Sequence, residues 1–190
     1  MSKNPPKSIF EKALKSKSDV SLSFFSYLFS EIIKYLNSKE DNRSIQEKLN
    51  EFGHSIGQKV YEYYNFRDQK LQARKLKIKD VLLYIYGNIW QSFFGSKPEA
   101  LDKSVEEEDE YRIYEKGPIT NRFLASKSDP VNCADFIGGI LEGMLYAAEF
   151  PAKVDAIVIS EKEGIINKKV AYIIKFKKSI VERDNLLGKQ

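Results

Sequence analysis

The residues best suited to catalysis are scarce in this sequence, which has one histidine, His54, and one cysteine, Cys133. Nucleophilic catalysis by serine or cysteine needs a neighbouring base, which is usually a histidine. His54 lies beside Gly53 in the middle of an expected helix, where a histidine without a partner is typical of a surface or packing residue. One cysteine and one histidine far apart in the sequence also cannot supply the clustered ligands of a structural zinc site.

Other kinds of chemical site lack their sequence signatures as well. Gly138 and Gly139 fall inside an expected helix, whereas a phosphate-binding glycine loop lies between a strand and a helix. No calcium-binding loop occurs, and no carboxylate pair has the apolar setting of a tuned acid or base. The RNA-recognition strand motif is missing, and the Lys and Arg residues are scattered. We therefore expect a protein that is not an enzyme, binds no nucleic acid and holds no cofactor or metal.

Composition indicates an ordinary globular chain of one domain. Of its 190 residues, 42% are hydrophobic and 31% are charged, and the formal net charge is only +4. The single cysteine excludes an internal disulfide and fits a reducing compartment. The sequence has no recognisable signal peptide, lipidation motif or stretch of 18 apolar residues, so we do not expect it to span a membrane.

Aromatic residues are abundant, at 13% of the chain, and many fall on strongly apolar helices expected at 21–37, 45–66 and 78–94. Leu22, Phe25 and Phe29 begin a helical apolar period in the first of these. Phe24 and Leu28 widen that stripe beyond one face, and a helix apolar on several faces must be covered on more than one side. The aromatic excess therefore predicts either a large core or an interface.

Two glycines in the second helix carry a further prediction. Ser44 and Glu47 form a capping box that starts this helix, and Gly53 and Gly57 lie four residues apart on one face. Each glycine costs about 1 kcal/mol relative to alanine inside a helix. Two such costs at this spacing predict that another backbone approaches closely there.

The second half of the chain is expected to supply a sheet. Two strands joined across Gly117-Pro118 follow an acidic loop at 96–110, whose charges either are solvated or form a docking patch. The further expected elements are strands at 111–116, 121–126, 152–160 and 168–177, a helix at 132–148 capped by Asn132, and a short helix in 178–190. The fold class is thus α+β: a four-stranded, mainly antiparallel sheet with helices packed on it, in the order ααα-ββ-α-ββ plus a short C-terminal helix.

These elements divide the chain into two parts. Residues 1–19 form a basic arm, which is either a flexible tail or a segment that docks through Ile9 to Leu14. Residues 20–190 form the single α+β domain.

Six segments resemble the subunit-5 branch of the transport protein particle (TRAPP) small-subunit family. They are SLSFFSYLFSEII (21–33), NIWQSFFG (88–95), YRIYEKGPIT (111–120), NCADFIGGILEGML (132–145), FPAKVDA (150–156) and YIIKFKKSIVERD (172–184). Together they cover most of the chain from residue 20 onward, and the combination of NCADF, a glycine pair and FPAKV at this spacing is specific.

The resemblance implies a role in ER-to-Golgi vesicle transport. Members of the family assemble into a complex that tethers vesicles and promotes nucleotide exchange on a Rab GTPase. It implies a non-catalytic structural subunit that pairs with the acyl-channel paralogue and touches a sedlin-like subunit. It also implies a cytoplasmic location, peripheral to cis-Golgi and endoplasmic reticulum membranes, with membrane contact only through the complex.

The family pairs through its first two helices, so the resemblance makes Phe24, Leu28, Tyr35, Ile45 and Leu49 the interface candidates, with intradomain core as the alternative for each. In isolation, the vacant face would allow a homodimer.

The acyl-channel paralogue carries an acylated cysteine before its third helix, but residues 71–76 here read LQARKL, without a cysteine. We therefore expect side chains such as Tyr84, Tyr86 and Trp90 to fill the core, and Cys133 to be buried. The competing hypothesis is a small-molecule or lipid-binding module of the same superfamily fold.

Overall fold

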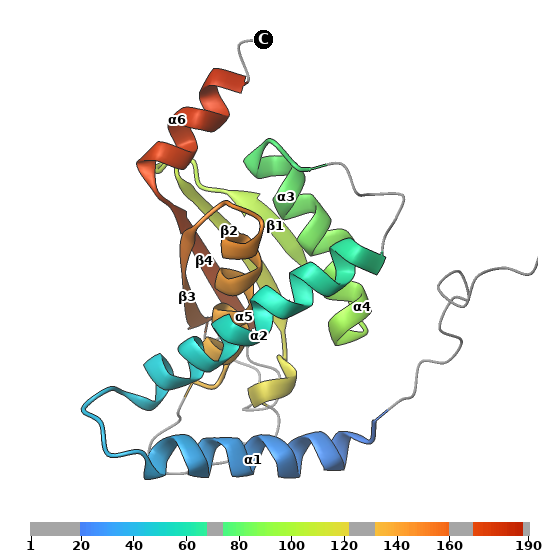
Figure 1. Cartoon of the computed structure of the whole chain (residues 1–190), viewed down its shortest axis with the longest axis vertical. Coiled ribbons are helices and arrows are strands. Elements are labelled where there is room, and N and C mark those ends of the chain that lie inside the picture. The colour runs from blue at the N-terminus through green and yellow to red at the C-terminus, as the bar shows by residue number, and fades with distance from the viewer. Residues whose placement is uncertain (1–19, 68–73, 122–131, 160–168, 188–190) are drawn as a thin grey trace, which may run out of the picture.

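The computed structural model describes residues 20–67, 74–121, 132–159 and 169–187, so the expected arm at 1–19 lies outside the described residues (Figure 1). Along the chain the elements are α1 (Leu22–Ser38), α2 (Ile45–Arg67), α3 (Ile78–Tyr84), the π-helix η3 (Ile85–Ile89), α4 (Trp90–Phe94), β1 (Ala100–Lys103), β2 (Glu110–Lys116), the 3-10 helix η4 (Ile119–Asn121), α5 (Ala134–Ala147), β3 (Ala152–Ile159), β4 (Lys169–Phe176) and α6 (Lys178–Leu187). The α+β class and the expected order of helices and strands are confirmed.

The sheet has four strands in the order β1-β2-β4-β3, and every neighbouring pair is antiparallel. Val170, Tyr172, Ile174 and Phe176 alternate along β4 and are all buried. They lie on the face covered by α5, because side chains of a strand alternate between the two faces of a sheet. Figure 1 shows α5 over the sheet, α2 crossing α5 on the outside, and α1 lying across one end of the molecule.

The close backbone approach that the glycines of α2 predict is confirmed, and its partner is α5. A methyl group on Gly53 would overlap the carbonyl oxygen of Phe136, and one on Gly57 would overlap that of Ile140. The contact is reciprocal, because a methyl group on Gly139 of α5 would overlap the carbonyl oxygen of Asn50. The two helices therefore pack backbone against backbone.

The helix ends largely follow their predicted signals. In the capping box, the Glu47 N–H donates to the Ser44 hydroxyl over 3.2 Å and the Ser44 N–H donates to the Glu47 carboxylate over 2.9 Å. The expected helix 78–94 is continuous, but its middle five residues form a π-helix, and it ends at left-handed Gly95. The expected helix at 132–148 begins two residues late, and Asn132 still caps it by accepting from the Ala134 N–H.

The expected strand at 121–126 is wrong where the structure describes it. After Gly117 the chain forms η4, in which the Asn121 N–H donates to the Pro118 carbonyl over 3.0 Å, and residues 122–126 lie outside the described part. Both edges of β2 are already taken, by β1 and β4. The fourth strand of the sheet is instead β1, which lies inside the region 96–110 that the sequence predicts to be a loop.

Side chains of α5, and of Asn132 just before it, protect the free edge of β3. The Glu142 carboxylate accepts from the Val154 N–H over 3.2 Å, and Asn132 donates to the Ala156 carbonyl over 2.8 Å. The Asp135 carboxylate accepts from the Ala156 N–H. Occupying these outward groups disfavours pairing with a strand of another chain, a known hazard of edge strands.

Replacing Gly57 with alanine should destabilise the fold by about 1–3 kcal/mol, because overpacking of the α2–α5 contact outweighs the gain in helix propensity. Urea unfolding measures the change. Gly87→Ala is the matched control, since no described atom outside its own helix lies within 4 Å of the added methyl group. That variant should be neutral or more stable by up to about 1 kcal/mol. Equal effects of the two substitutions would contradict the close approach.

Asp135 should make stability depend on pH. Burial raises the pKa of its carboxyl from 3.8 to about 6, with Asp155 adding to the rise. The folded chain then binds more protons than the unfolded chain between these values, so this contribution to stability is lost as pH rises from about 4 to about 6. The stability of Asp135→Asn relative to the wild type should therefore be higher at about pH 7.5 than at about pH 4. A difference independent of pH would contradict this assignment.

Candidate protein-interaction surface

Helix α1 carries two apolar ridges. Ser21 starts it by accepting from the Phe24 N–H over 3.2 Å. One ridge faces inward: Phe29 and Leu36 are buried, and the Phe29 ring lies 5.4 Å from the ring of Phe136 on α5. Burial of this ridge accounts for the packing of α1 on the domain. It does not account for the apolar residues of the second ridge.

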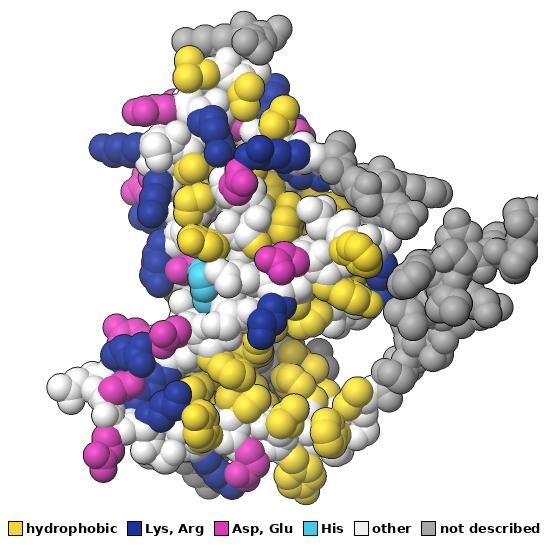
Figure 2. Space-filling model, viewed as in Figure 1, with side chains coloured by type: hydrophobic (Ala, Val, Ile, Leu, Met, Phe, Trp, Pro, Cys, Tyr) yellow, Lys and Arg dark blue, Asp and Glu magenta, His cyan; other side chains and the backbone are white. Residues whose placement is uncertain are grey.

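The second ridge faces outward. Phe24, Leu28 and Tyr35 are 59%, 49% and 62% exposed, and their spacing places them along one line of the helix. Tyr27, next to Leu28, is also exposed, whereas exposed Leu22 lies on the side of the inward ridge, about 160° around the helix from Phe24. We call Phe24, Tyr27, Leu28 and Tyr35 the α1 ledge, and Figure 2 shows hydrophobic side chains gathered over this end of the molecule. Large exposed apolar patches of this kind mark interaction sites.

Helix α2 adds a different residue from those expected. Phe52 is partly exposed, and its ring stacks on Phe136, whose ring also contacts Phe29 of α1, at a centroid distance of 6.0 Å. Ile45 is half-buried against the core. Leu49 is fully buried, so its assignment to an exposed face is corrected: it belongs to the core of this chain. The period of α2 alone gives no way to tell which of its apolar residues turn inward.

The sequence does not single out Tyr27 or Phe52. Phe52 keeps the apolar period of its helix, which is typical of a core residue. Tyr27 has a detectable signal, because it lies next to Leu28 and outside the inward period that Phe25 and Phe29 begin.

The turn between α1 and α2 is a network of charged groups. Arg43 donates to the Asp41 carboxylate over 2.9 Å through Nη2, and its backbone N–H donates to the same carboxylate. These bonds lower the pKa of Asp41 from 3.8 to about 2, with the Arg43 side chain as the largest cause. The buried ammonium of Lys48 lies 3.2 Å from the Asp41 carboxylate. The turn is therefore held by side chains of its own sequence.

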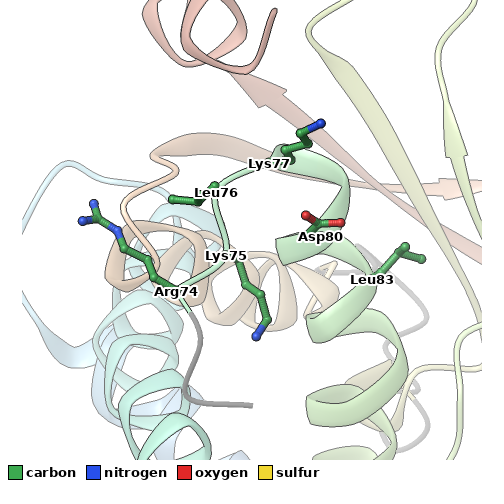
Figure 3. Close-up of a pocket in the computed structure, with 6 residues that line it drawn as sticks. All are labelled: Arg74, Lys75, Leu76, Lys77, Asp80 and Leu83. Atoms are coloured by element: carbon green, nitrogen blue, oxygen red, sulfur yellow. The ribbon is translucent and has the colours of Figure 1, made fainter. Parts of the chain in front are cut away.

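A surface hollow of about 480 Å³ opens beside the start of α3 (Figure 3). Its cations are Arg74, Lys75 and Lys77, and Figure 3 shows their side chains pointing in different directions. Arg74 pairs with Glu149, and Lys75 lies 4.8 Å from the centre of the Tyr84 ring. Charges that diverge in this way do not form a convergent site for one anion.

The interior along α3 to α4 is filled by aromatic rings. Trp90 is fully buried, with its ring 5.7 Å from Tyr172 and 4.9 Å from Phe94. Tyr84 is also buried, whereas Tyr86 is half-buried and donates to the Pro98 carbonyl over 3.2 Å. Because side chains fill this interior, these contacts favour a structural subunit over the alternative of a small-molecule or lipid-binding module.

The acidic run at 106–110 is partly neutralised within the chain. Lys175 lies 3.1 Å from the Glu107 carboxylate and 3.3 Å from that of Glu110, and Arg112 also donates to Glu110. Among the residues that the structure describes, no group of three or more His, Cys, Asp or Glu side chains is placed to hold a metal ion. No described helix is both long enough and apolar enough to cross a membrane.

Comparison with known proteins identifies relatives along nearly the whole chain. The family model described as transport protein particle (TRAPP) component matches residues 25–177. Trafficking protein particle complex subunit 5 of Dictyostelium discoideum is 35% identical, over 97% of this chain and 100% of the relative. Human trafficking protein particle complex subunit 5 is 30% identical, over 94% of this chain and 93% of the relative. Trafficking protein particle complex subunit 31 of Saccharomyces cerevisiae is 24% identical, over 96% of this chain and 84% of the relative.

Solved structures share the fold at low sequence identity. Trafficking protein particle complex subunit 3 of Naegleria fowleri, covalently bound to palmitic acid, superposes with a TM-score of 0.63 at 14% identity, over 83% of this chain and 95% of that one. An H-NOX protein of S. oneidensis gives a TM-score of 0.53 at 11% identity, over 88% and 82%. At these identities the likeness establishes the architecture alone.

Cys133 should be inert in the folded chain. Its side chain is fully buried, and burial raises the pKa of its thiol to about 12, so almost no reactive thiolate is present at neutral pH. A maleimide reagent should label the native chain at most slowly and the urea-unfolded chain fully, as read by intact mass. Rapid labelling of the native chain would contradict this burial.

Proposed function

Since the chain belongs to the transport protein particle (TRAPP) family, on its subunit-5 branch, we propose that it is a non-catalytic structural subunit of a complex that tethers vesicles and promotes nucleotide exchange on a Rab GTPase. Its task is to bind neighbouring subunits and hold them in place. The Rab GTPase binds the assembled complex, and this chain does not itself supply most of the surface that promotes nucleotide exchange. The process served is transport from the endoplasmic reticulum to the Golgi.

The α1 ledge is the observation that carries this proposal. Phe24, Leu28 and Tyr35 expose large apolar surfaces on a helix whose other side already packs on the domain. An obligate partner would cover this face, since such interfaces resemble a protein core cut in half. Aromatic residues are enriched at interface centres, which fits Phe24 and Tyr35.

The partner proposed for this face is the acyl-channel TRAPP paralogue, which shares the fold and would present its own first two helices. A sedlin-like subunit is the second proposed neighbour. A chain expressed without its partner would cover the ledge by self-association, giving a homodimer. The proposed location is the cytoplasmic side of cis-Golgi and endoplasmic reticulum membranes, reached through the complex.

The substitution Leu28→Asp should abolish binding to the paralogue without unfolding the chain. Leu28 is half exposed, so a carboxylate there stays solvated in the free chain but would be buried unpaired in the complex. The test is co-expression with the tagged paralogue, followed by affinity capture and circular dichroism of the variant.

Asn37→Asp is the matched control, because it adds the same charge to α1 roughly 180° around the helix from Leu28. Asn37 is exposed. Capture of Asn37→Asp but not of Leu28→Asp is expected. Normal capture of a folded Leu28→Asp chain would show that the partner binds another face.

A further inference from the structure

Helix α1 packs on the domain along its inward ridge, where Phe29 and Leu36 are buried and the Phe29 ring contacts Phe136. At its C-terminal end, α1 has neither a glycine nor a left-handed residue to close it, because Lys39 follows in an extended conformation. Figure 1 shows α1 across the end of the molecule opposite α6. The last carbonyls of α1 therefore need a partner from elsewhere in the chain, and that partner helps to set the angle of the helix.

Lys48, in the first turns of α2, holds that end. Its side chain is only 6% exposed, and its ammonium donates to the carbonyls of Leu36 over 3.2 Å and Lys39 over 3.0 Å. The carboxylate of Asp41 lies 3.2 Å from the same nitrogen. An ammonium has three N–H donors, so these three acceptors satisfy it fully. We call this group the Lys48 cap.

Leu36 is buried at this end, but apolar packing does not satisfy the carbonyls that Lys48 binds. A surface hollow of about 240 Å³ lies beside it, lined in part by Leu36, Lys48 and Phe52. The cation also complements the negative end of the α1 dipole. Without the ammonium, the Leu36 and Lys39 carbonyls would lose this partner and the helix end would be free to change its angle.

We infer that Lys48 is a positioning residue for partner binding: the Lys48 cap fixes the angle of α1 so that Phe24, Leu28 and Tyr35 meet the partner as one surface. This inference rests on the proposed function, since it concerns the same ledge. Lys48 itself is buried and need not contact the partner. Its effect on binding is exerted through α1.

The test is a competition within cells. The wild-type chain and Lys48→Met, carrying different tags, are co-expressed with a limiting amount of the paralogue, and the captured ratio is measured by mass spectrometry. Lys48→Met should be incorporated roughly tenfold less than the wild type, because a helix free to change its angle populates the binding geometry only in part. Hydrogen exchange should also become faster in residues 22–38 of the variant.

A purely structural effect is separated by Ile180→Ala, a buried substitution on α6 at the far end of the molecule. This variant lowers stability without touching α1, so it should be incorporated nearly as well as the wild type. Equal incorporation of Lys48→Met and Ile180→Ala would overturn the inference while leaving the proposed function standing. Failure of the wild-type chain to enter the complex would overturn both.

A second pair of variants decides the matter if Lys48→Met does not fold. Asp41→Ala removes one acceptor of the Lys48 cap at the surface, whereas Arg43→Ala removes only the neighbouring salt bridges to Asp41 and Glu51. Asp41→Ala should lower incorporation more than Arg43→Ala does. Equal effects of these two variants would overturn the inference.

Discussion

The contact between the backbones of α2 and α5 determines where the other helices lie. Gly53 and Gly57 on one helix face Gly139 and Gly143 on the other, and a side chain at any of the four would strike a backbone carbonyl. Because α5 packs on the sheet, this contact makes α2 an outer layer whose remaining surface is available to α1. The fold tolerates four glycines in helices, at about 1 kcal/mol each, in return for this approach.

The position of α2 has a direct consequence for function. Helix α1 packs on the domain through its inward ridge, where Phe29 and Leu36 are buried, so its other ridge is left in solvent. A single chain has no further element among the described residues that covers Phe24, Leu28 and Tyr35. On the proposed function, a second protein covers this apolar surplus, and the Lys48 cap keeps the exposed ridge at a defined angle.

Much of this arrangement can be predicted from the sequence, and the exceptions have physical causes. The main helices are predictable because apolar residues recur at three- and four-residue spacing over many residues of one segment. The glycine contact is predictable because Gly53 and Gly57 lie four residues apart on one helix face. Strand β1 was not, because only Leu101 among its four residues is a large apolar side chain, and its pairing with β2 decides its conformation. The Gly117-Pro118 signal correctly marks a turn, but the turn leads into η4 rather than a strand.

The interface residues were predictable only in part. An apolar helix covered on two sides offers no periodic signal that separates the two faces, so the sequence leaves Leu49 open between interface and intradomain core, and the structure buries it fully. Lys48 could not have been found from the sequence, because it looks like any charged residue in the first turn of a helix. Its role depends on carbonyls that the fold brings to it from residues 36 and 39.

The most direct test of the central claim is to co-express this chain with the acyl-channel TRAPP paralogue of its own organism and to determine the mass of the product by size exclusion with light scattering. One species with the mass of a one-to-one complex is expected. Two separate, well-behaved monomers would contradict it, because the exposed ridge of α1 would then have no partner to explain it.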